Sequence, residues 1–169
     1  MTMEITHNAD GSIEYQVDGR LMRIFPDEQM TEHFTLREML RSYYAEQRGI
    51  LNLPQDETIV PALRRLCVKV LEPLRQKIGR KIVISSGYRT PCLNYCVGGS
   101  KDSQHKRGEA ADMYCTGERD ARELFLAVKD SLPYDQLIME HRKKSDVWWV
   151  HVSYTERRDN RQWAFNKTV

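Results

Sequence analysis

The chain has 169 residues, of which 40% are hydrophobic and 30% charged, and its formal net charge at pH 7 is +2. This length fills one hydrophobic core and is short for two ordinary domains, so we expect a single domain over residues 1–169, acting as a monomer. The composition excludes a membrane-spanning protein and a strongly basic nucleic-acid binder, because no apolar run approaches ~20 residues and basic residues barely outnumber acidic ones.

The N-terminal part is predicted to form a small β-meander followed by a helix. Turn-forming residues separate short strand-like runs within residues 1–25. From Thr35 the apolar residues repeat at intervals of three and four, and Glu38 completes a capping-box pattern with Thr35. We expect one helix that begins here and ends near Gly49.

A longer helix and a central strand are expected next. Apolar residues form one stripe over 60–78, which is typical of an amphipathic helix. Pro73 lies inside this pattern and lacks a backbone donor, which predicts a kink or a second short helix. The β-branched run 81–85 predicts a central strand, and a short helix should begin at Thr90-Pro91 and end before Gly98.

The C-terminal half combines strand and helix patterns. Residues 110–115 are typical of a strand and 119–131 of an amphipathic helix. Strands over 136–140 and 147–154, joined by a short polar loop, predict an antiparallel hairpin, while 155–169 is expected to be a polar surface tail. The order of elements indicates an α+β fold, with helices packed on a mainly antiparallel sheet.

The four cysteines indicate neither a zinc knuckle nor a disulfide scaffold. No two of them have the two-residue separation of a sulfur-ligated zinc motif, and four are few for a disulfide-rich domain of this length. We therefore expect buried free thiols at these positions: Cys67, Cys92, Cys96 and Cys115.

Three other side chains form a candidate metal site. His105 lies seven residues before Asp112, and the period of two in the strand 110–115 directs Asp112 away from the apolar core face. In the last strand, His151 shares a face with Trp149. Two imidazoles and a carboxylate suit zinc and leave a fourth position open for water. The spacing alone leaves open the alternative that His151 is an ordinary core histidine.

The residues around this site occur in three motifs: Ser86-Gly87-Tyr88-Arg89-Thr90-Pro91 with Asn94, Val97-Gly98-Gly99, and Ser103-Gln104-His105-x-x-Gly108-x-Ala110-x-Asp112. In this order they closely resemble the core of the zinc D-Ala-D-Ala carboxypeptidase family of cell-wall peptidases. The resemblance covers 34–154, because 34–54 is similar to the family's opening helical segment and Trp149-Val150-His151-Val152-Ser153 to its closing strand.

The resemblance implies one zinc ion per chain, held by His105, Asp112 and His151. It also implies that Arg89 contacts the substrate and its polarised carbonyl, and that Ser103 helps to hold the peptide. These roles agree with the chemistry, since zinc acts as a Lewis acid and a fixed guanidinium stabilises an oxyanion or a carboxylate. Ser103 could instead only cap the turn.

The general base departs from the pattern of the family. Related enzymes often carry an acidic residue three positions before the last zinc histidine, or a histidine two before it, and here those positions are Trp148 and Trp149. Glu140, at the end of the preceding strand, is the best replacement, because a hairpin can place it beside Trp149. The alternatives are that Glu140 is only a solvated residue at the end of the strand, or that His141 is the base. Trp149 is expected to form a wall of the substrate groove, and Tyr88 either to line it or to support the turn.

The resemblance implies hydrolysis of a peptide bond in peptidoglycan stem peptides, at terminal D-Ala-D-Ala or at an internal link such as L-Ala-D-Glu. No secretory signal is visible, so we expect synthesis in the cytoplasm and action on the wall after lysis, as in phage or prophage endolysins, or after another route of export. One alternative is a non-catalytic module that keeps zinc and binds a peptide or the cell wall. Another is a zinc-free protein of similar fold.

Overall fold

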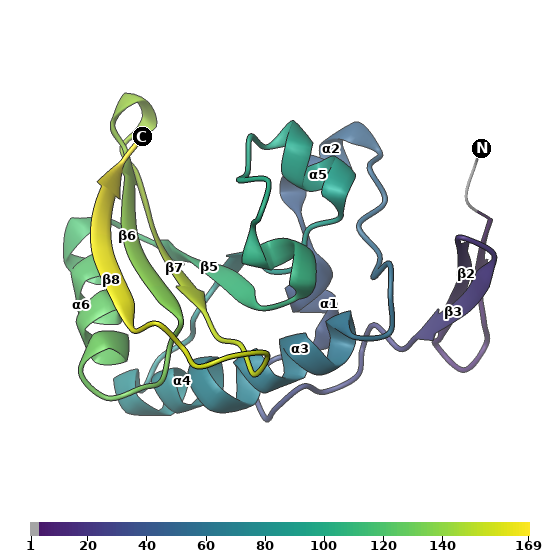
Figure 1. The fold of residues 1–169 in the computed structure, drawn as a ribbon, viewed down its shortest axis with the longest axis horizontal. Coiled ribbons are helices and arrows are strands. Elements are labelled where there is room, and N and C mark those ends of the chain that lie inside the picture. The colour runs from purple at the N-terminus through teal and green to yellow at the C-terminus, as the bar shows by residue number, and fades with distance from the viewer. Residues whose placement is uncertain (1–3) are drawn as a thin grey trace.

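The computed structural model describes residues 4–169 and has an α+β architecture with two β-sheets (Figure 1). The first sheet is an antiparallel meander of β1 (Ile5–His7), β2 (Ile13–Val17) and β3 (Arg20–Ile24). The second has the order β4-β5-β7-β6-β8, from β4 (Ile84–Ser86), β5 (Ala110–Cys115), β6 (Gln136–Arg142), β7 (Val147–Ser153) and β8 (Trp163–Thr168). Its pairings are antiparallel except for β6 with β8, which confirms the predicted α+β class and mainly antiparallel sheet.

The helices are short except for α6 and the continuous helical run of α3 and α4. They are α1 (Leu36–Leu40), α2 (Tyr43–Arg48), α3 (Ile59–Leu66), α4 (Glu72–Ile78), α5 (Pro91–Cys96) and α6 (Glu118–Lys129). A π-helical turn (Cys67–Leu71) joins α3 to α4, and 3-10 turns occupy Gln104–Arg107 and Lys143–Ser145. Among the described residues, no helix is long and apolar enough to cross a membrane.

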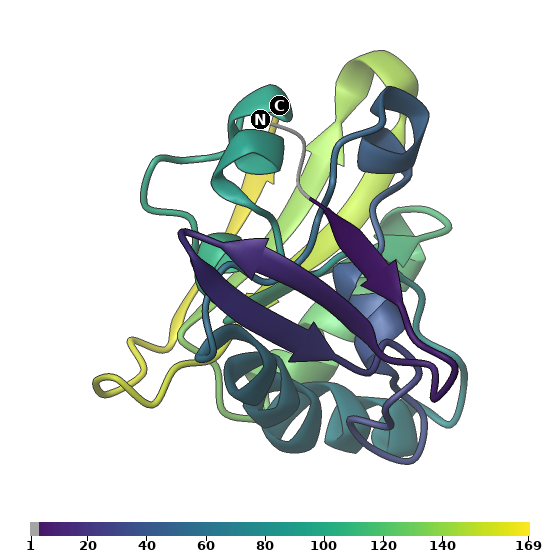
Figure 2. The same cartoon turned by 90° about the vertical axis from the view of Figure 1, so that its right-hand side faces the viewer.

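The predicted meander is present in the described part of residues 1–25; residues 1–3 lie outside the described residues. Figure 2 shows its three strands lying across one side of the molecule. Tyr15 is only 1% exposed and packs into the main hydrophobic core, and its hydroxyl donates to the Pro54 carbonyl at 2.8 Å. The N-terminal sheet is thus attached to the helices by both apolar packing and a buried hydrogen bond.

The single helix predicted from Thr35 to Gly49 is wrong, because the chain forms two. Thr35 and Glu38 make the expected capping box at the start of α1. Arg41 then adopts an extended backbone, and the Ser42 hydroxyl accepts from the Ala45 N–H to begin α2. A serine that offers its own cap favours a new helix start over continuation. Gly49, in the left-handed region, ends α2 as expected.

The longer helix and its proline behave largely as predicted. Pro73 lies in the first turn of α4, a second short helix that ends at Gly79. The π-helical turn ahead of it widens the hydrogen-bonding pattern, so that the Glu72 N–H bonds to the Cys67 carbonyl. Such an insertion accommodates the missing donor of a proline without separating the two helices.

Two features of the second sheet differ from the predictions. The strand expected over 81–85 is limited to Ile84–Ser86 and lies at an edge of the sheet rather than at its centre. The tail expected over 155–169 contributes β8, which pairs in parallel with β6 at the opposite edge. Strand order depends on partners far away in the sequence, which a local β-branched or polar pattern cannot specify.

The two faces of the second sheet have different roles, as the alternation predicted. Helix α6 packs on one face, where Met113 of β5 and Val150 and Val152 of β7 are fully buried in the core (Figure 1). The other face carries Asp112 and His151. This face is therefore the floor of the candidate site.

The expectation that all cysteines are buried is wrong for two of them. Cys67 and Cys115 are buried, whereas Cys92 and Cys96 are exposed on α5. That helix turns only Leu93 and Asn94 inward, so its remaining positions stay in solvent.

Candidate metal centre

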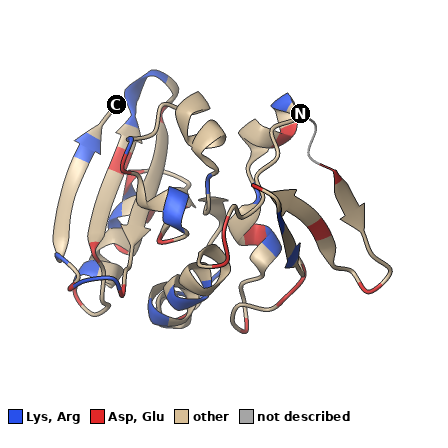
Figure 3. Ribbon diagram, turned by 45° about the vertical axis from the view of Figure 1, so that its right-hand side comes forward, with Lys and Arg blue, Asp and Glu red and all other residues tan. Residues whose placement is uncertain are grey.

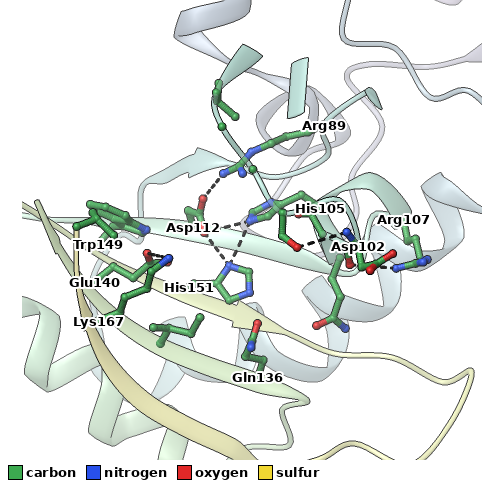
Figure 4. A pocket seen from close by; sticks show the side chains of 18 of the residues that line it. Arg89, Asp102, His105, Arg107, Asp112, Gln136, Glu140, Trp149, His151 and Lys167 are labelled. Atoms are coloured by element: carbon green, nitrogen blue, oxygen red, sulfur yellow. Dashed lines mark hydrogen bonds and ion pairs between the residues drawn. The ribbon is translucent and has the colours of Figure 1, made fainter. Parts of the chain in front are cut away.

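Three potential ligand atoms converge on the open face of the second sheet (Figure 4). His105 Nε2 lies 3.2 Å from Asp112 Oδ1 and 3.2 Å from His151 Nδ1, and the latter two atoms are 2.9 Å apart. All three residues are at most 7% exposed. The structure thus brings together the three residues that the sequence proposed as ligands.

Strand pairing explains how residues distant in sequence meet here. Asp112 on β5 lies directly opposite His151 on β7 in the antiparallel ladder, so their side chains leave the sheet on the same face. His105 comes from the 3-10 turn that precedes β5. Gly108 ends that turn with a positive φ of 68°, a conformation that glycine adopts without strain, and the chain then enters β5.

A backbone carbonyl fixes the orientation of His105. Its Nδ1 lies 2.6 Å from the Gly87 carbonyl oxygen, so Nδ1–H donates there and Nε2 keeps its lone pair for a metal. Gly87 itself passes very close to α1, since an added Cβ would lie 2.3 Å from the Met39 carbonyl oxygen. Glycine is required at this position because there is no room for a Cβ, and not because the backbone has a positive φ.

A guanidinium, itself held by a hydroxyl, fixes the carboxylate of Asp112. The second oxygen of Asp112 accepts a hydrogen bond from Arg89 Nη2, and Arg89 Nε donates to Ser86 Oγ at 2.7 Å. Burial by itself would raise the pKa of Asp112, but contacts with His105, His151 and Arg89 outweigh it and hold that pKa well below the usual range. Asp112 is therefore ionised.

Burial lowers the pKa of His105, whereas by itself it would raise that of Asp112. A buried imidazolium loses its hydration, and this loss outweighs the attraction of the Asp112 carboxylate, which would raise the pKa of His105. A neutral imidazole beside an ionised carboxylate is the protonation state that metal ligation requires.

The donor set fits a tetrahedral zinc ion. Zinc–ligand distances of about 2.0 Å place neighbouring ligand atoms about 3.3 Å apart in a tetrahedron, close to the 2.9–3.2 Å separations of the three atoms. Three protein ligands also leave one position free on the cleft side. These residues could therefore hold a metal ion, with the chemistry of a catalytic rather than a closed structural site.

Glu140 lies on the same face of the sheet as the three ligands. In the β6–β7 ladder Ile138 is opposite His151 and Glu140 is opposite Trp149, so the two-residue period puts Glu140 beside the site. Its side chain is 12% exposed and its Oε2 lies 3.6 Å from Lys167 Nζ of β8 (Figure 4). Of the two candidate bases, only Glu140 has its side chain on the face of the ligands, because the neighbouring His141 points to the opposite face.

The other predicted contacts differ in their placement. Arg89, Ser103 and Trp149 line the cleft around the ligands, which has a volume of about 970 Å³. Tyr88 does not line it and is only 1% exposed, so of the two alternatives for Tyr88 the one in which it lines the groove and binds substrate is wrong. Its backbone N–H bonds to the Met39 carbonyl and its ring enters the core, where burial raises the pKa of its hydroxyl to about 12.

A second group of metal-compatible side chains lies away from this cleft, formed by Glu32, His33 and Glu72. His33 Nδ1 already contacts Glu72 Oε1 at 2.6 Å, and the His33 N–H donates to Oε2 at 3.2 Å. Burial would raise the pKa of Glu72, but its hydrogen bonds from His33 lower it. This pairing ties the loop before α1 to the start of α4.

Sequence reasoning missed the groups that support the ligands. The Gly87 carbonyl and the Ser86 hydroxyl both belong to the motif that contains Arg89, so proximity in sequence was the available signal. The cleft is also lined by residues of the C-terminal tail, including Arg158, and no local pattern indicates that contact.

Comparison with known proteins agrees with this geometry. A model of the peptidase M15 family matches residues 32–153, which is most of the chain and includes all three ligands and Glu140. No curated protein sequence matches the chain. The match confirms the resemblance found in the motifs, and the chain belongs to the M15 peptidases, the zinc D-Ala-D-Ala carboxypeptidase family.

Proposed function

We propose that this chain is a zinc-dependent peptidase that hydrolyses a peptide bond in the stem peptides of bacterial peptidoglycan. The observation that carries the proposal is the convergence of His105, Asp112 and His151 in a cleft whose floor also presents Glu140. Membership of the M15 family supports the metal and the class of substrate. One zinc ion per chain would be held by the three converging ligands.

Each side chain has a role that follows from its position. When bound, zinc supplies Lewis-acid polarisation of the scissile carbonyl and makes the attacking water more acidic. Glu140 accepts the proton that this water loses and passes it to the leaving amine. Arg89 holds Asp112 through Nη2, and its Nη1, which bonds to no other group among residues 4–169, contacts the substrate carbonyl. Ser103 and Trp149 hold the peptide in the cleft.

The bond that is cut is either the terminal D-Ala-D-Ala bond or an internal link such as L-Ala-D-Glu. The masses of the products released from purified peptidoglycan distinguish the two, because the first reaction releases one amino acid and the second divides the stem. We further propose that the protein acts on the wall as a lysis enzyme once the membrane is breached.

The deciding experiment is Glu140→Gln, with zinc content and cleavage of muropeptides measured on the same preparations. We expect one zinc per chain in both proteins and a loss of cleavage of about 100-fold or more, the usual contribution of a general base. Glu118→Gln on the exposed side of α6 is the control, since it removes the same charge far from the cleft. Full cleavage by Glu140→Gln would refute the role of Glu140.

A non-catalytic module that binds the wall predicts a different result. The unmutated, zinc-loaded protein would then bind wall fragments and cleave none of them. A zinc-free protein would contain no metal after purification and lose no stability with a chelator. Glu140 lies opposite Trp149 on the face of the ligands, where it can replace the acid that the positions of Trp148 and Trp149 lack, and this placement favours the enzyme over the module.

A further inference from the structure

The segment that follows β7 forms a wall of the metal cleft. Residues 154–169 lie beyond the part of the chain that the family model matches. Within them, β8 extends the sheet beside β6, and several residues of β8 and of the loop before it line the cleft. Four basic cleft residues come from this segment: Arg157, Arg158, Arg161 and Lys167. Figure 3 shows basic positions on β8 and on the loop that leads into it.

Two buried carboxylates hold the arginines of this loop in place. Asp135, whose side chain is fully buried, accepts hydrogen bonds from Arg158 Nη2 at 2.9 Å and from Arg161 Nη2 at 2.7 Å. Glu109, next to the turn that carries His105, accepts from Arg157 Nε and Nη2 at 2.7 and 2.8 Å. The loop is therefore fixed at two points, beside the turn that carries His105 and at the start of β6.

The two arginines on Asp135 keep an excess of positive charge. Two guanidinium groups share one carboxylate, so their cluster carries a net charge of +1. Arg158 and Arg161 remain 41% and 43% exposed, and Arg161 Nη1 makes no hydrogen bond within residues 4–169. Preorganised guanidinium donors of this kind bind carboxylates with little loss of conformational entropy.

We propose that Arg158 and Arg161 form an anion-binding subsite that selects peptides with a free carboxylate over their amidated counterparts. The inference rests on the proposed function only in taking a peptide as the occupant of the cleft. One arginine is enough to neutralise Asp135. The second guanidinium therefore leaves a positive charge at this wall of the cleft, which a substrate carboxylate can pair with. The carboxylate belongs either to the peptide C-terminus or to an internal D-Glu residue.

The test measures binding by calorimetry at two salt concentrations, on zinc-loaded protein that carries Glu140→Gln, because the proposed mechanism leaves this variant unable to cleave the ligands. The ligands are three synthetic stem peptides: one with both carboxylates free, one amidated at the C-terminus, and one amidated at D-Glu. Arg161→Gln leaves Asp135 paired with Arg158, and Arg161→Lys keeps the charge without the planar fork. Arg122→Gln is the control, because Arg122 pairs only with Glu118 on the exposed surface of α6 within the described residues.

We expect one of the amidations to weaken binding to the Glu140→Gln protein with both arginines intact about tenfold, the usual size of a charged hydrogen bond. In Arg161→Gln that difference disappears, Arg161→Lys retains part of it, and Arg122→Gln retains all of it. The amidation that matters identifies the carboxylate. Equal binding of all three peptides by the Glu140→Gln protein with both arginines intact, or an unchanged difference after Arg161→Gln, would overturn the subsite.

Failure of the proposed function gives a different pattern. If none of the peptides is cleaved but the free acid still binds more tightly than one amide, the subsite stands and the peptidase assignment falls. If cleavage occurs with no preference for the free acid in binding, the peptidase assignment stands and the subsite falls.

Discussion

Gly87→Ala is expected to weaken the metal centre without touching any ligand. The added Cβ would lie 2.3 Å from the Met39 carbonyl oxygen, whereas ordinary carbon–oxygen contacts are longer than about 3.4 Å. The clash is with backbone on both sides, so the segment must move away from α1 by about 1 Å. Two contacts are lost or lengthened by this shift: the Tyr88 N–H to Met39 bond of 2.8 Å and the His105 Nδ1 contact of 2.6 Å with the Gly87 carbonyl.

These contacts set the expected magnitude. Overpacking in a close-packed interior costs about 1–3 kcal/mol of folding free energy. Losing the group that orients a ligating histidine typically costs 10–100-fold in metal affinity. The variant should therefore unfold at lower urea concentration when metal-free, and its zinc affinity should fall by at least about tenfold.

The assay compares urea unfolding of the metal-free protein with competitive zinc titration. Gly117→Ala is the matched control, because Gly117 has an extended φ of 164° and an added Cβ there meets nothing within 4 Å. The control should change stability by less than about 1 kcal/mol and leave zinc affinity unaltered. Unchanged zinc affinity in Gly87→Ala would refute the reasoning that this carbonyl orients His105.

Three further predictions concern parts of the fold around the site. Burial would raise the pKa of Asp135, but hydrogen bonds from two arginines lower that pKa. The stability that the ionised carboxylate gives the fold is therefore present above about pH 4 and is lost as the pH falls further. Asp135→Asn should cost about 1–3 kcal/mol at pH 7 in urea unfolding and reduce the loss of stability between pH 4 and pH 2.5. Asn52→Ala should cost about 3 kcal/mol, because its side chain makes three hydrogen bonds of 2.8–2.9 Å between α1 and the segment after β4. A thiol reagent should label Cys92 and Cys96 in the folded protein and the two buried cysteines only after unfolding.

Each of these has a result that contradicts it. An unchanged slope of stability against pH in Asp135→Asn would mean that the carboxylate does not stabilise the tail. Asn166→Ala, at an exposed position of β8, is the control for Asn52→Ala and should be close to neutral. Early labelling of Cys67 or Cys115 would contradict their burial, which raises both thiol pKa values to about 12.

Much of the candidate site follows from local periodicity. A strand alternates its faces every two residues, so apolar neighbours on one side indicate from the sequence alone where Asp112 and His151 point. For Glu140 the periodicity is not enough, because its face depends on the register of the hairpin, and the structure sets that register by pairing Glu140 with Trp149. Helix starts at Thr35 and Thr90 are also predictable, because a capping side chain and the helix that it starts are close in sequence.

Other features depend on partners that are distant in sequence. The edge position of β4 and the pairing of β8 with β6 are set by which strands meet, and no local pattern encodes that. The same limit applies to Tyr88, whose aromatic ring fits either a cleft or a core, and only packing against α1 decided for the core.

The sequence by itself determined the class of fold, the three metal-compatible side chains and the faces from which Asp112 and His151 leave their strands, because these follow from periodicity and short motifs. Only the tertiary structure decided that Arg89 binds Asp112, that the Gly87 carbonyl orients His105, and that the tail closes the cleft with basic residues. Those contacts require segments far apart in the chain to be positioned to within a few tenths of an ångström, and such positions are fixed by packing of the whole core.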